Sequence, residues 1–415
     1  MKPQLKQAVI LSAAVLTSTS AVATNGDNLI GIGPISRAMG GTGIAAPQDA
    51  ISAVFANPAA MCFTPGCDYA EVNFGGTIFA PRPSATFNGV SSDSKENIYA
   101  IPAIGLSLPL DKDTRRWRVG LAAYGVTGLG VDYRSTALED ALAAQQLPGA
   151  YTSLQIMKFA PSIAYQVTPN FSLGGALHID YATLDLRNGS SPAYGLGAQF
   201  GLIYKPFERF SVGANVVTPQ KTKFKEVVPG PQGNGNLTLE APLTVGAGIA
   251  YSMVEERLLL TAEGRWLNWG DADGYSDFDW EDQWVAAAGI QFAAIPKKLF
   301  LRLGYNYGSN PVKANNGWTP WDGASAPSPE TFRTVQGLAF PNQAYETFRI
   351  LGFPAIVEHH LTAGIGYAFS DKFEMNLGYM HAFQNSLSES SAGGVYTIES
   401  TLSENSLELG FTWRF

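Results

Sequence analysis

The residues of this sequence that could carry acid, base or nucleophilic chemistry are few and widely separated. Its four histidines are His178, His359, His360 and His381. A hydrolase needs a nucleophile beside such a base, but the sequence contains neither a Gly-x-Ser-x-Gly nor a His-Glu-x-x-His motif. We therefore expect no enzymatic activity, and hydrolysis stays as a remote alternative.

The cysteines Cys62 and Cys67 are separated by a short segment that contains the turn-forming pair Pro65-Gly66. In an oxidising compartment this spacing predicts a disulfide that closes a small hairpin. A tetrahedral metal site would need further Cys or His ligands, and the sequence places none near this pair. We expect no metal ion and no other cofactor.

Acidic residues gather in one short stretch, at Asp271, Asp273, Asp277, Asp279 and Glu281. Gly274 is misplaced for the calcium loop of an EF-hand. We interpret this stretch as a solvated acidic loop, or as a loose divalent bridge to lipopolysaccharide.

Basic residues within segments of alternating polarity could anchor a carboxylate ligand, because a buried carboxylate needs a positive partner. The candidates are Lys158, Arg265 and Arg302, and the segment from Phe171 to Leu186 offers only His178. Acidic residues in similar segments could pair with these bases instead, and they are Glu263, Glu374 and Glu408. Recognition of a carboxylate is thus left open.

Composition indicates a membrane barrel as the element that positions these residues. Charged residues make up 15% of the chain and aromatic residues 12%, and the chain contains 44 glycines. Transmembrane strands produce this combination because only every second side chain faces lipid, and a soluble β-sandwich is the alternative. The net charge of −8, without a basic stripe, argues against nucleic-acid binding.

Alternating apolar and polar residues predict about fourteen antiparallel strands, an even number as in bacterial barrels. In the last one, every second residue from Leu407 to Phe415 is Leu, Phe or Trp, and Glu, Gly, Thr and Arg lie between them. Short turns alternate with long loops, as in outer-membrane barrels. The predicted strands span residues 69–80, 97–110, 116–131, 152–167, 170–186, 193–205, 208–218, 237–252, 257–268, 283–294, 298–308, 358–369, 372–383 and 398–415.

The N-terminal residues predict export. Lys2 and Lys6 form a basic region, Ala8 to Leu16 an apolar region, and Ala21-Val22-Ala23 a cleavage site. We expect residues 1–23 to be a signal peptide, and the mature protein to lie in the outer membrane of a Gram-negative bacterium. It would meet the barrel-assembly machinery during biogenesis, contact membrane lipid and lipopolysaccharide, and remain a monomer.

Residues 24–67 lack strand alternation and are rich in Gly, Ala, Ser and Asn, so they cannot span lipid. The run Gly31 to Gly43, followed by Asp49-Ala50 and Asn57-Pro58-Ala59, resembles the hatch of the FadL/TodX family. Members of that family carry long-chain fatty acids and hydrocarbons across the outer membrane. The hatch motif comprises Gly33, Arg37, Gly40, Gly41, Asp49, Asn57, Pro58 and Ala59.

This resemblance implies that residues 24–67, hereafter the hatch, plug an all-β transmembrane barrel formed by residues 68–415. It also implies that a ligand leaves sideways through a kink in the third strand, where the candidate glycines are Gly120, Gly125, Gly128 and Gly130. The implied function is passive uptake of hydrophobic small molecules, either long-chain fatty acids or aromatic and aliphatic hydrocarbons. A general polar porin, or a purely structural barrel, is the alternative.

The loops depart from the family in one respect. Studied fatty-acid transporters build an outer groove from long loops after strands five and seven, but here the loop after strand five is only about Arg187 to Pro192. The loop after strand three, with an amphipathic helix expected near residues 137–147, could supply the groove instead. So could the aromatic-rich loop from Asn310 to Val357.

Overall fold

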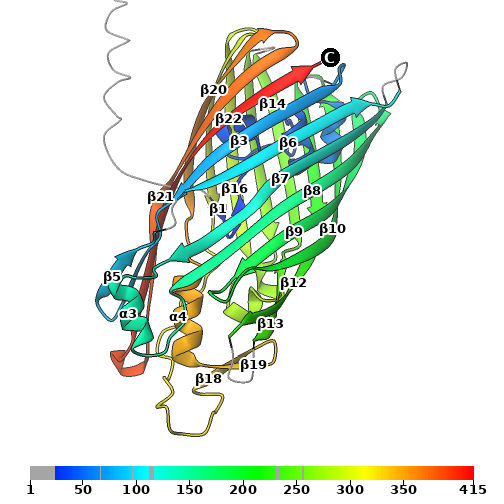
Figure 1. The fold of residues 1–415 in the computed structure, drawn as a ribbon. Helices are drawn as coiled ribbons and strands as arrows, with labels where there is room; N and C mark the ends of the chain where they lie inside the picture. The colour runs from blue at the N-terminus through cyan, green and yellow to red at the C-terminus, as the bar shows by residue number, and fades with distance from the viewer. Residues whose placement is uncertain (1–23, 66, 96–97, 112–115, 230–233, 255–256) are drawn as a thin grey trace, which may run out of the picture.

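The computed structural model describes residues 24–65, 67–95, 98–111, 116–229, 234–254 and 257–415. The expected signal peptide, residues 1–23, lies outside this part of the chain. A closed barrel dominates the structure, and the hatch lies in its bore (Figure 1). No helix of the described residues is both long and apolar enough to cross a bilayer.

The barrel has 14 antiparallel strands, which confirms the predicted fold. Each strand pairs with the next in chain order, and the last closes the ring by pairing with the first from Arg414↔Glu71 to Glu404↔Pro81. Closure removes the two free edges that an open sheet would present to lipid. The strands are β3 (Glu71–Pro81), β6 (Tyr99–Pro109), β7 (Trp117–Asp132), β8 (Tyr151–Thr168), β9 (Phe171–Asp185), β10 (Ser191–Phe207), β11 (Phe210–Val217), β14 (Thr244–Val254), β15 (Leu258–Leu267), β16 (Gln283–Ile295), β17 (Leu299–Gly308), β20 (His359–Ser370), β21 (Phe373–Ser390) and β22 (Thr397–Arg414).

Side-chain alternation separates the lipid face from the bore. In β22, Leu407 and Leu409 are 47% and 42% exposed, whereas Glu408 between them is 1% exposed. Trp284 and Trp413, near opposite ends of the barrel, are 65% and 61% exposed. Aromatic girdles lie at these heights in outer-membrane barrels. The predicted faces of the last strand are therefore confirmed.

Long loops cluster at the end of the barrel opposite the C terminus, and several carry their own structure (Figure 1). The helix expected near residues 137–147 is confirmed as α3. The prediction of one strand over 237–252 is wrong. Pro242 cannot donate a ladder hydrogen bond, and the segment is divided between a loop strand that ends at Ala241 and a barrel strand that begins at Thr244. The loop elements are β4 (Ser84–Phe87), β5 (Val90–Asp93), α3 (Ala137–Ala143), β12 (Gln220–Val228), β13 (Gly235–Ala241), η2 (Trp269–Asp271), η3 (Ser276–Phe278), β18 (Phe332–Val335), β19 (Leu338–Pro341), α4 (Asn342–Gly352) and η4 (Ala392–Gly394).

The hatch forms short elements with local caps. The Asp49 side chain accepts a hydrogen bond from Ser52 N at 2.8 Å and thereby caps the N-terminus of a helix. The Asn57 side chain accepts one from Ala59 N at 3.2 Å at the start of the next turn. These elements are β1 (Thr24–Asn25), β2 (Asn28–Leu29), α1 (Pro34–Ala38), α2 (Ala50–Ala56) and η1 (Pro58–Cys62).

Glycines on the inner face of the wall let the hatch approach closely. A Cβ on Gly304 would lie 2.1 Å from Gly40 N, and one on Gly213 would lie 2.3 Å from Ile44 O. Gly40 itself has a φ of +73°, in the left-handed region that favours glycine. Part of the glycine content of the strands therefore serves hatch packing.

Candidate functional site

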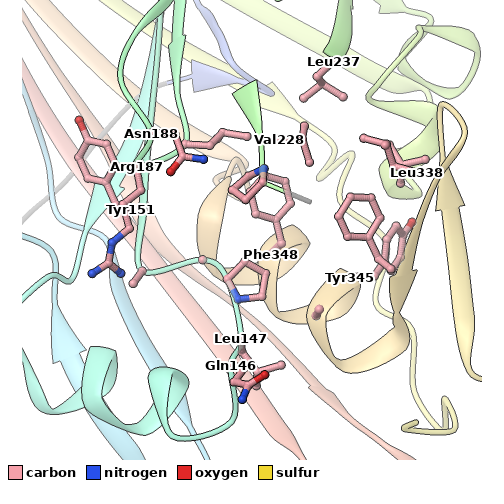
Figure 2. Close-up of a pocket in the computed structure, with 18 of the residues that line it drawn as sticks. Gln146, Leu147, Tyr151, Arg187, Asn188, Val228, Leu237, Leu338, Tyr345 and Phe348 are labelled. Carbon is pink, nitrogen blue, oxygen red and sulfur yellow. The ribbon is translucent and has the colours of Figure 1, made fainter. Parts of the chain in front are cut away.

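An apolar cavity of about 380 Å³ lies among the outer loops (Figure 2). Leu147 follows α3, Leu237 belongs to the β12–β13 hairpin, Leu338 to the β18–β19 hairpin, and Tyr345 and Phe348 to α4, and all five line it. Its volume falls within the range of about 300–1,000 Å³ that is usual for small-molecule sites. Both loops that the sequence suggested as groove-forming contribute to it.

Aromatic rings that line this outer cavity pack on one another. Phe278 of η3 stacks on Tyr345 with centroids 6.0 Å apart and tilts toward Phe348 at 5.4 Å. The Tyr345 hydroxyl donates to Asp279 Oδ2 at 2.9 Å. The outer cavity is thus shaped by rigid rings whose polar ends are satisfied.

A buried ion cluster fixes helix α4 beside the cavity. The Arg349 guanidinium pairs with Glu346 at 2.7 Å and with Glu389 of β21, and all three side chains are fully buried. Burial raises the pKa of Glu346, and the adjacent Arg349 opposes that rise. Removing one partner of such a cluster would strand a buried charge, so the cluster holds α4 in one position.

A second cavity, of about 100 Å³, lies deeper in the bore between the hatch and the wall. Leu29 and Phe55 of the hatch and Tyr124 and Val126 of β7 contribute to its apolar lining. Lys158, His178 and Arg265 are among its polar residues. We call it the inner cavity.

The ladder between β6 and β7 is incomplete beside the inner cavity. β6 pairs with β7 only from Pro109↔Arg118 to Ala103↔Tyr124. Beyond that point residues 99–102 of β6 pair only with β3, and residues 125–132 of β7 pair with β8. We call this unpaired stretch the wall break.

Contacts on three sides bound the wall break. The Ala103↔Tyr124 pair closes its inner end, and at its outer end Lys95 N donates to Asp132 O at 2.8 Å. On the bore side, Asn28 of hatch strand β2 bridges to Thr127. The hatch therefore reaches the stretch of the wall where β6 and β7 are not paired.

The glycines predicted for this strand have different roles. Gly120 lies below the wall break, and a Cβ there would lie 2.5 Å from Met61 Sδ of the hatch. A Cβ on Gly125 would lie 2.6 Å from Ile101 Cγ2 across the wall break, one on Gly130 would lie 2.4 Å from Thr152 O, and one on Gly128 would have no atom within 4 Å. The bulge lies between Gly125 and Thr127, which face Met157 and Ile156. The extra residue is therefore Val126, which the sequence did not reveal.

Arg37 is the hatch-motif residue that carries a positive charge into the bore. It is 1% exposed, its Nε lies 3.2 Å from Glu408 Oε2, and its Nη2 donates to Gly31 O at 3.0 Å. Glu408 belongs to β22, so this ion pair joins the hatch to the barrel wall.

The other hatch-motif residues shape or anchor the hatch backbone. Gly33 precedes α1 with a φ of +86°, and Gly41 follows it with a φ of +80°. Asn57 Nδ2 donates to Leu202 O of β10 at 2.9 Å, and Pro58 and Ala59 form the turn that Gly174 of β9 accommodates. The motif is thus a set of close contacts with the wall.

The three candidate bases all have partners within the protein. Lys158 lies 3.2 Å from Asp180, Arg265 pairs with Glu263, and Arg302 lies 3.6 Å from Glu374. Arg302 also lines a third cavity, of about 740 Å³, at the end of the bore opposite the outer loops. This cavity is separate from the outer and the inner cavity. The residue that sequence reasoning missed is Asp180, although it follows His178 by two positions on the same strand face.

The predicted disulfide between Cys62 and Cys67 is not formed, and both cysteines are free. Turn η1 buries Cys62 to 6% exposure and directs its Sγ to Arg116 O of the wall, at 3.9 Å. Cys67 is held in a separate tight turn, in which its N–H donates to Thr64 O at 3.0 Å. Each cysteine is thus held by a different local contact, Cys62 by the wall and Cys67 by Thr64.

The acidic stretch is engaged with neighbouring loops. Asp273 pairs with Lys221 at 2.6 Å and Glu281 with Lys313 at 2.7 Å. Among the residues that the structure describes, no three His, Cys, Asp or Glu side chains are grouped so as to hold a metal ion.

Comparison with known proteins supports the resemblance. Residues 10–199 match the profile of the family described as outer membrane protein transport protein (OMPP1/FadL/TodX), in agreement with the resemblance seen in the hatch motif. The Pseudomonas putida toluene transporter TodX has a TM-score of 0.66 at 18% identity, over 93% of this chain and 99% of that one. The Ralstonia pickettii toluene transporter TbuX gives 0.65 at 16%, over 94% and 99%. A Pseudomonas aeruginosa FadL homologue gives 0.64 at 14%, over 96% and 100%.

At these identities the solved structures show that the barrel fold is shared. No curated protein matches the sequence significantly.

Proposed function

We propose that this chain of the OMPP1/FadL/TodX family is a passive outer-membrane channel that takes up hydrophobic small molecules and releases them sideways into the membrane. The candidate cargoes are long-chain fatty acids and aromatic or aliphatic hydrocarbons. Similar proteins are described as toluene transporters and as a monoaromatic hydrocarbon channel. Export through residues 1–23 and action as a monomer without enzymatic activity belong to the same proposal.

The observation that carries this proposal is the wall break beside the inner cavity. Tyr124 is the last β7 residue that pairs with β6, and both it and Val126, two residues further along β7, line that cavity. An apolar molecule gains nothing by entering a water-filled pore, but direct transfer into lipid keeps its surface away from water. A bilayer therefore supplies the driving force, and no energy source is needed.

The buried hatch argues against a general polar porin. Ile30, Ile32 and Ile51 of the hatch are at most 2% exposed, and its backbone is bonded to inward-facing wall residues. An axial route for water-soluble solutes would require this packing to come apart. A sideways route leaves it in place.

A disulfide across the wall break tests the exit route. The Cβ that Gly125→Cys adds would lie 3.8 Å from the Cβ of residue 101, close to the mean of about 3.8 Å found in disulfides. We expect the Ile101→Cys/Gly125→Cys variant, made with Cys62→Ala and Cys67→Ala, to stop toluene uptake into proteoliposomes when oxidised. Reduction with dithiothreitol restores uptake.

A matched staple elsewhere serves as the control. The Cβ added by Gly248→Cys lies 3.4 Å from that of Ile44, so an Ile44→Cys/Gly248→Cys pair ties the hatch to β14. We expect this staple to leave uptake intact, because sideways exit does not require the hatch to leave the bore. The opposite pattern, with loss only on stapling the hatch, would establish an axial route.

A further inference from the structure

The inner cavity contains a polar network that bears on which cargo the channel accepts. We propose that this cavity selects uncharged molecules and excludes carboxylates, because Asp180 and its neighbours already occupy the Lys158 ammonium. The inference rests on the proposed transport function and narrows its cargo. Asp180 is then the specificity-determining residue.

The Lys158 ammonium is surrounded by partners from two other strands, β9 and β12. Its Nζ lies 3.2 Å from Asp180 Oδ1 and 3.3 Å from His178 Nδ1, and it donates to Gln220 Oε1 of β12. An ammonium has three N–H donors. Three protein acceptors already compete for them, so none is left for a ligand carboxylate.

This arrangement is built into the wall and tied to the hatch. Lys158 and Asp180 are direct cross-strand partners on β8 and β9. His178 Nε2 lies 3.2 Å from Gln199 Oε1, and Gln199 Nε2 donates to Phe55 O of the hatch at 3.0 Å. Freeing Lys158 would therefore require a rearrangement of the strands or of the hatch.

Arg265, the other strong base of the inner cavity, is occupied as well. Its guanidinium donates to Ile30 O at 3.1 Å and to Gly41 O at 2.6 Å, and it pairs with Glu263. The outer cavity repeats the pattern, because Arg187 at its rim lies 2.6 Å from Glu139 of α3. Along the proposed route, Arg265 and Arg187 are thus each already paired with a carboxylate of the protein.

The polar atoms of the inner cavity that lack a hydrogen-bond partner are acceptors, as a carboxylate is, so they cannot bind one. Asn25 Oδ1 and Asn215 Oδ1 are buried acceptors with no donor among the described residues. Asn215 Nδ2 donates to Ala56 O at 2.8 Å, which orients its Oδ1. An ionised carboxylate only accepts hydrogen bonds, so it could satisfy neither oxygen and would lose its own hydration.

Paired neutral and acidic probes test the inference. Uptake of radiolabelled toluene, benzoate and dodecanoate into proteoliposomes is measured near neutral pH, where carboxylic acids are ionised. We expect the wild type to take up toluene and exclude both acids. Asp180→Asn removes the carboxylate that neutralises the Lys158 ammonium, so a ligand carboxylate can take over as its counter-charge, and the ratio of acid to toluene uptake rises by about tenfold or more.

Two control variants separate this effect from a general change in charge. Lys158→Met/Asp180→Leu removes both charges, so the ratio does not rise. Glu281→Gln frees Lys313, whose pair with Glu281 is exposed on an outer loop, and it leaves the ratio unchanged. Heat-modifiable migration in electrophoresis shows that each barrel is folded.

Each result decides between named alternatives. Uptake of either acid by the wild type at a rate comparable with toluene overturns the selection. A folded Asp180→Asn barrel with an unchanged ratio overturns the role of Asp180. Failure of the wild type to take up any probe overturns the transport function itself, and the wild-type measurements decide the cargo class even if a variant does not assemble.

Discussion

The two halves of the bore are filled by different kinds of interaction. The hatch half is joined to the wall by directed polar contacts, such as Arg37 with Glu408 and the N–H groups of Gly43 and Ile44 with Glu263 Oε2, both at 3.0 Å. The outer half is filled by an apolar cluster that includes Leu142 and Leu351. Directed bonds specify one position, whereas apolar packing tolerates changes of shape better. The hatch is therefore held in one position by its contacts, whereas the packing of the outer loops leaves more freedom for their side chains to rearrange.

The largest expected effect is loss of the hatch anchor. Arg37→Met leaves Glu408 buried without its partner, which costs about 3–5 kcal/mol. We expect the hatch to loosen and ion conductance in planar bilayers to appear. The double variant Arg37→Met/Glu408→Gln removes the stranded charge and should conduct less. Equal and negligible conductance in both variants would show that the ion pair does not hold the hatch.

A smaller effect is expected from crowding the hatch interface. Gly304→Ala places a Cβ 2.1 Å from Gly40 N, and overpacking of this kind costs about 1–3 kcal/mol. We expect a lower unfolding temperature by circular dichroism and easier proteolysis of the hatch. The control Gly264→Ala has its nearest atom at 3.8 Å and should behave as wild type. If both variants unfold alike, close hatch packing is not the reason for the wall glycine.

The smallest effect is expected in the outer half. Phe348→Ala removes a ring from the outer cavity, and we expect the affinity for toluene to fall about tenfold, or about 1.4 kcal/mol. Trp321 lies on the same loop but packs on Phe332, with centroids 5.3 Å apart and away from the cavity lining, so Trp321→Ala should not change affinity. Equal losses in both variants would place binding elsewhere on the loop.

The barrel was predictable because strand alternation is a local property. Thirteen of the predicted strands, for example 116–131 and 398–415, correspond to observed strands, here β7 and β22, within a few residues at most boundaries. The exception, 237–252, fails at Pro242, where apolar alternation continues across a break in the ladder. The predicted strand 372–383 ends too early, because β21 continues to Ser390, past the membrane and into the outer loops.

The partners of the charged residues could not be predicted in the same way. Counting back ten residues from the pair Thr168↔Phe171 places Lys158 opposite Tyr181, which faces lipid at 40% exposure. A register shift between Gln166 and Thr168 instead brings Asp180 to that position. One irregularity near a turn therefore decides which residue neutralises Lys158.

By itself, the sequence determined the number of strands and the faces of residues such as those of the last strand, because these follow from alternation along the chain. A contiguous motif carried the family resemblance that implied a hatch. Tertiary structure alone decided where the β6–β7 ladder ends, at Ala103↔Tyr124, where β7 bulges, at Val126, and which carboxylate pairs with each base. These outcomes depend on register and on contacts between segments far apart in the chain, such as Asn28 with Thr127. Periodicity within a segment carries no information about either.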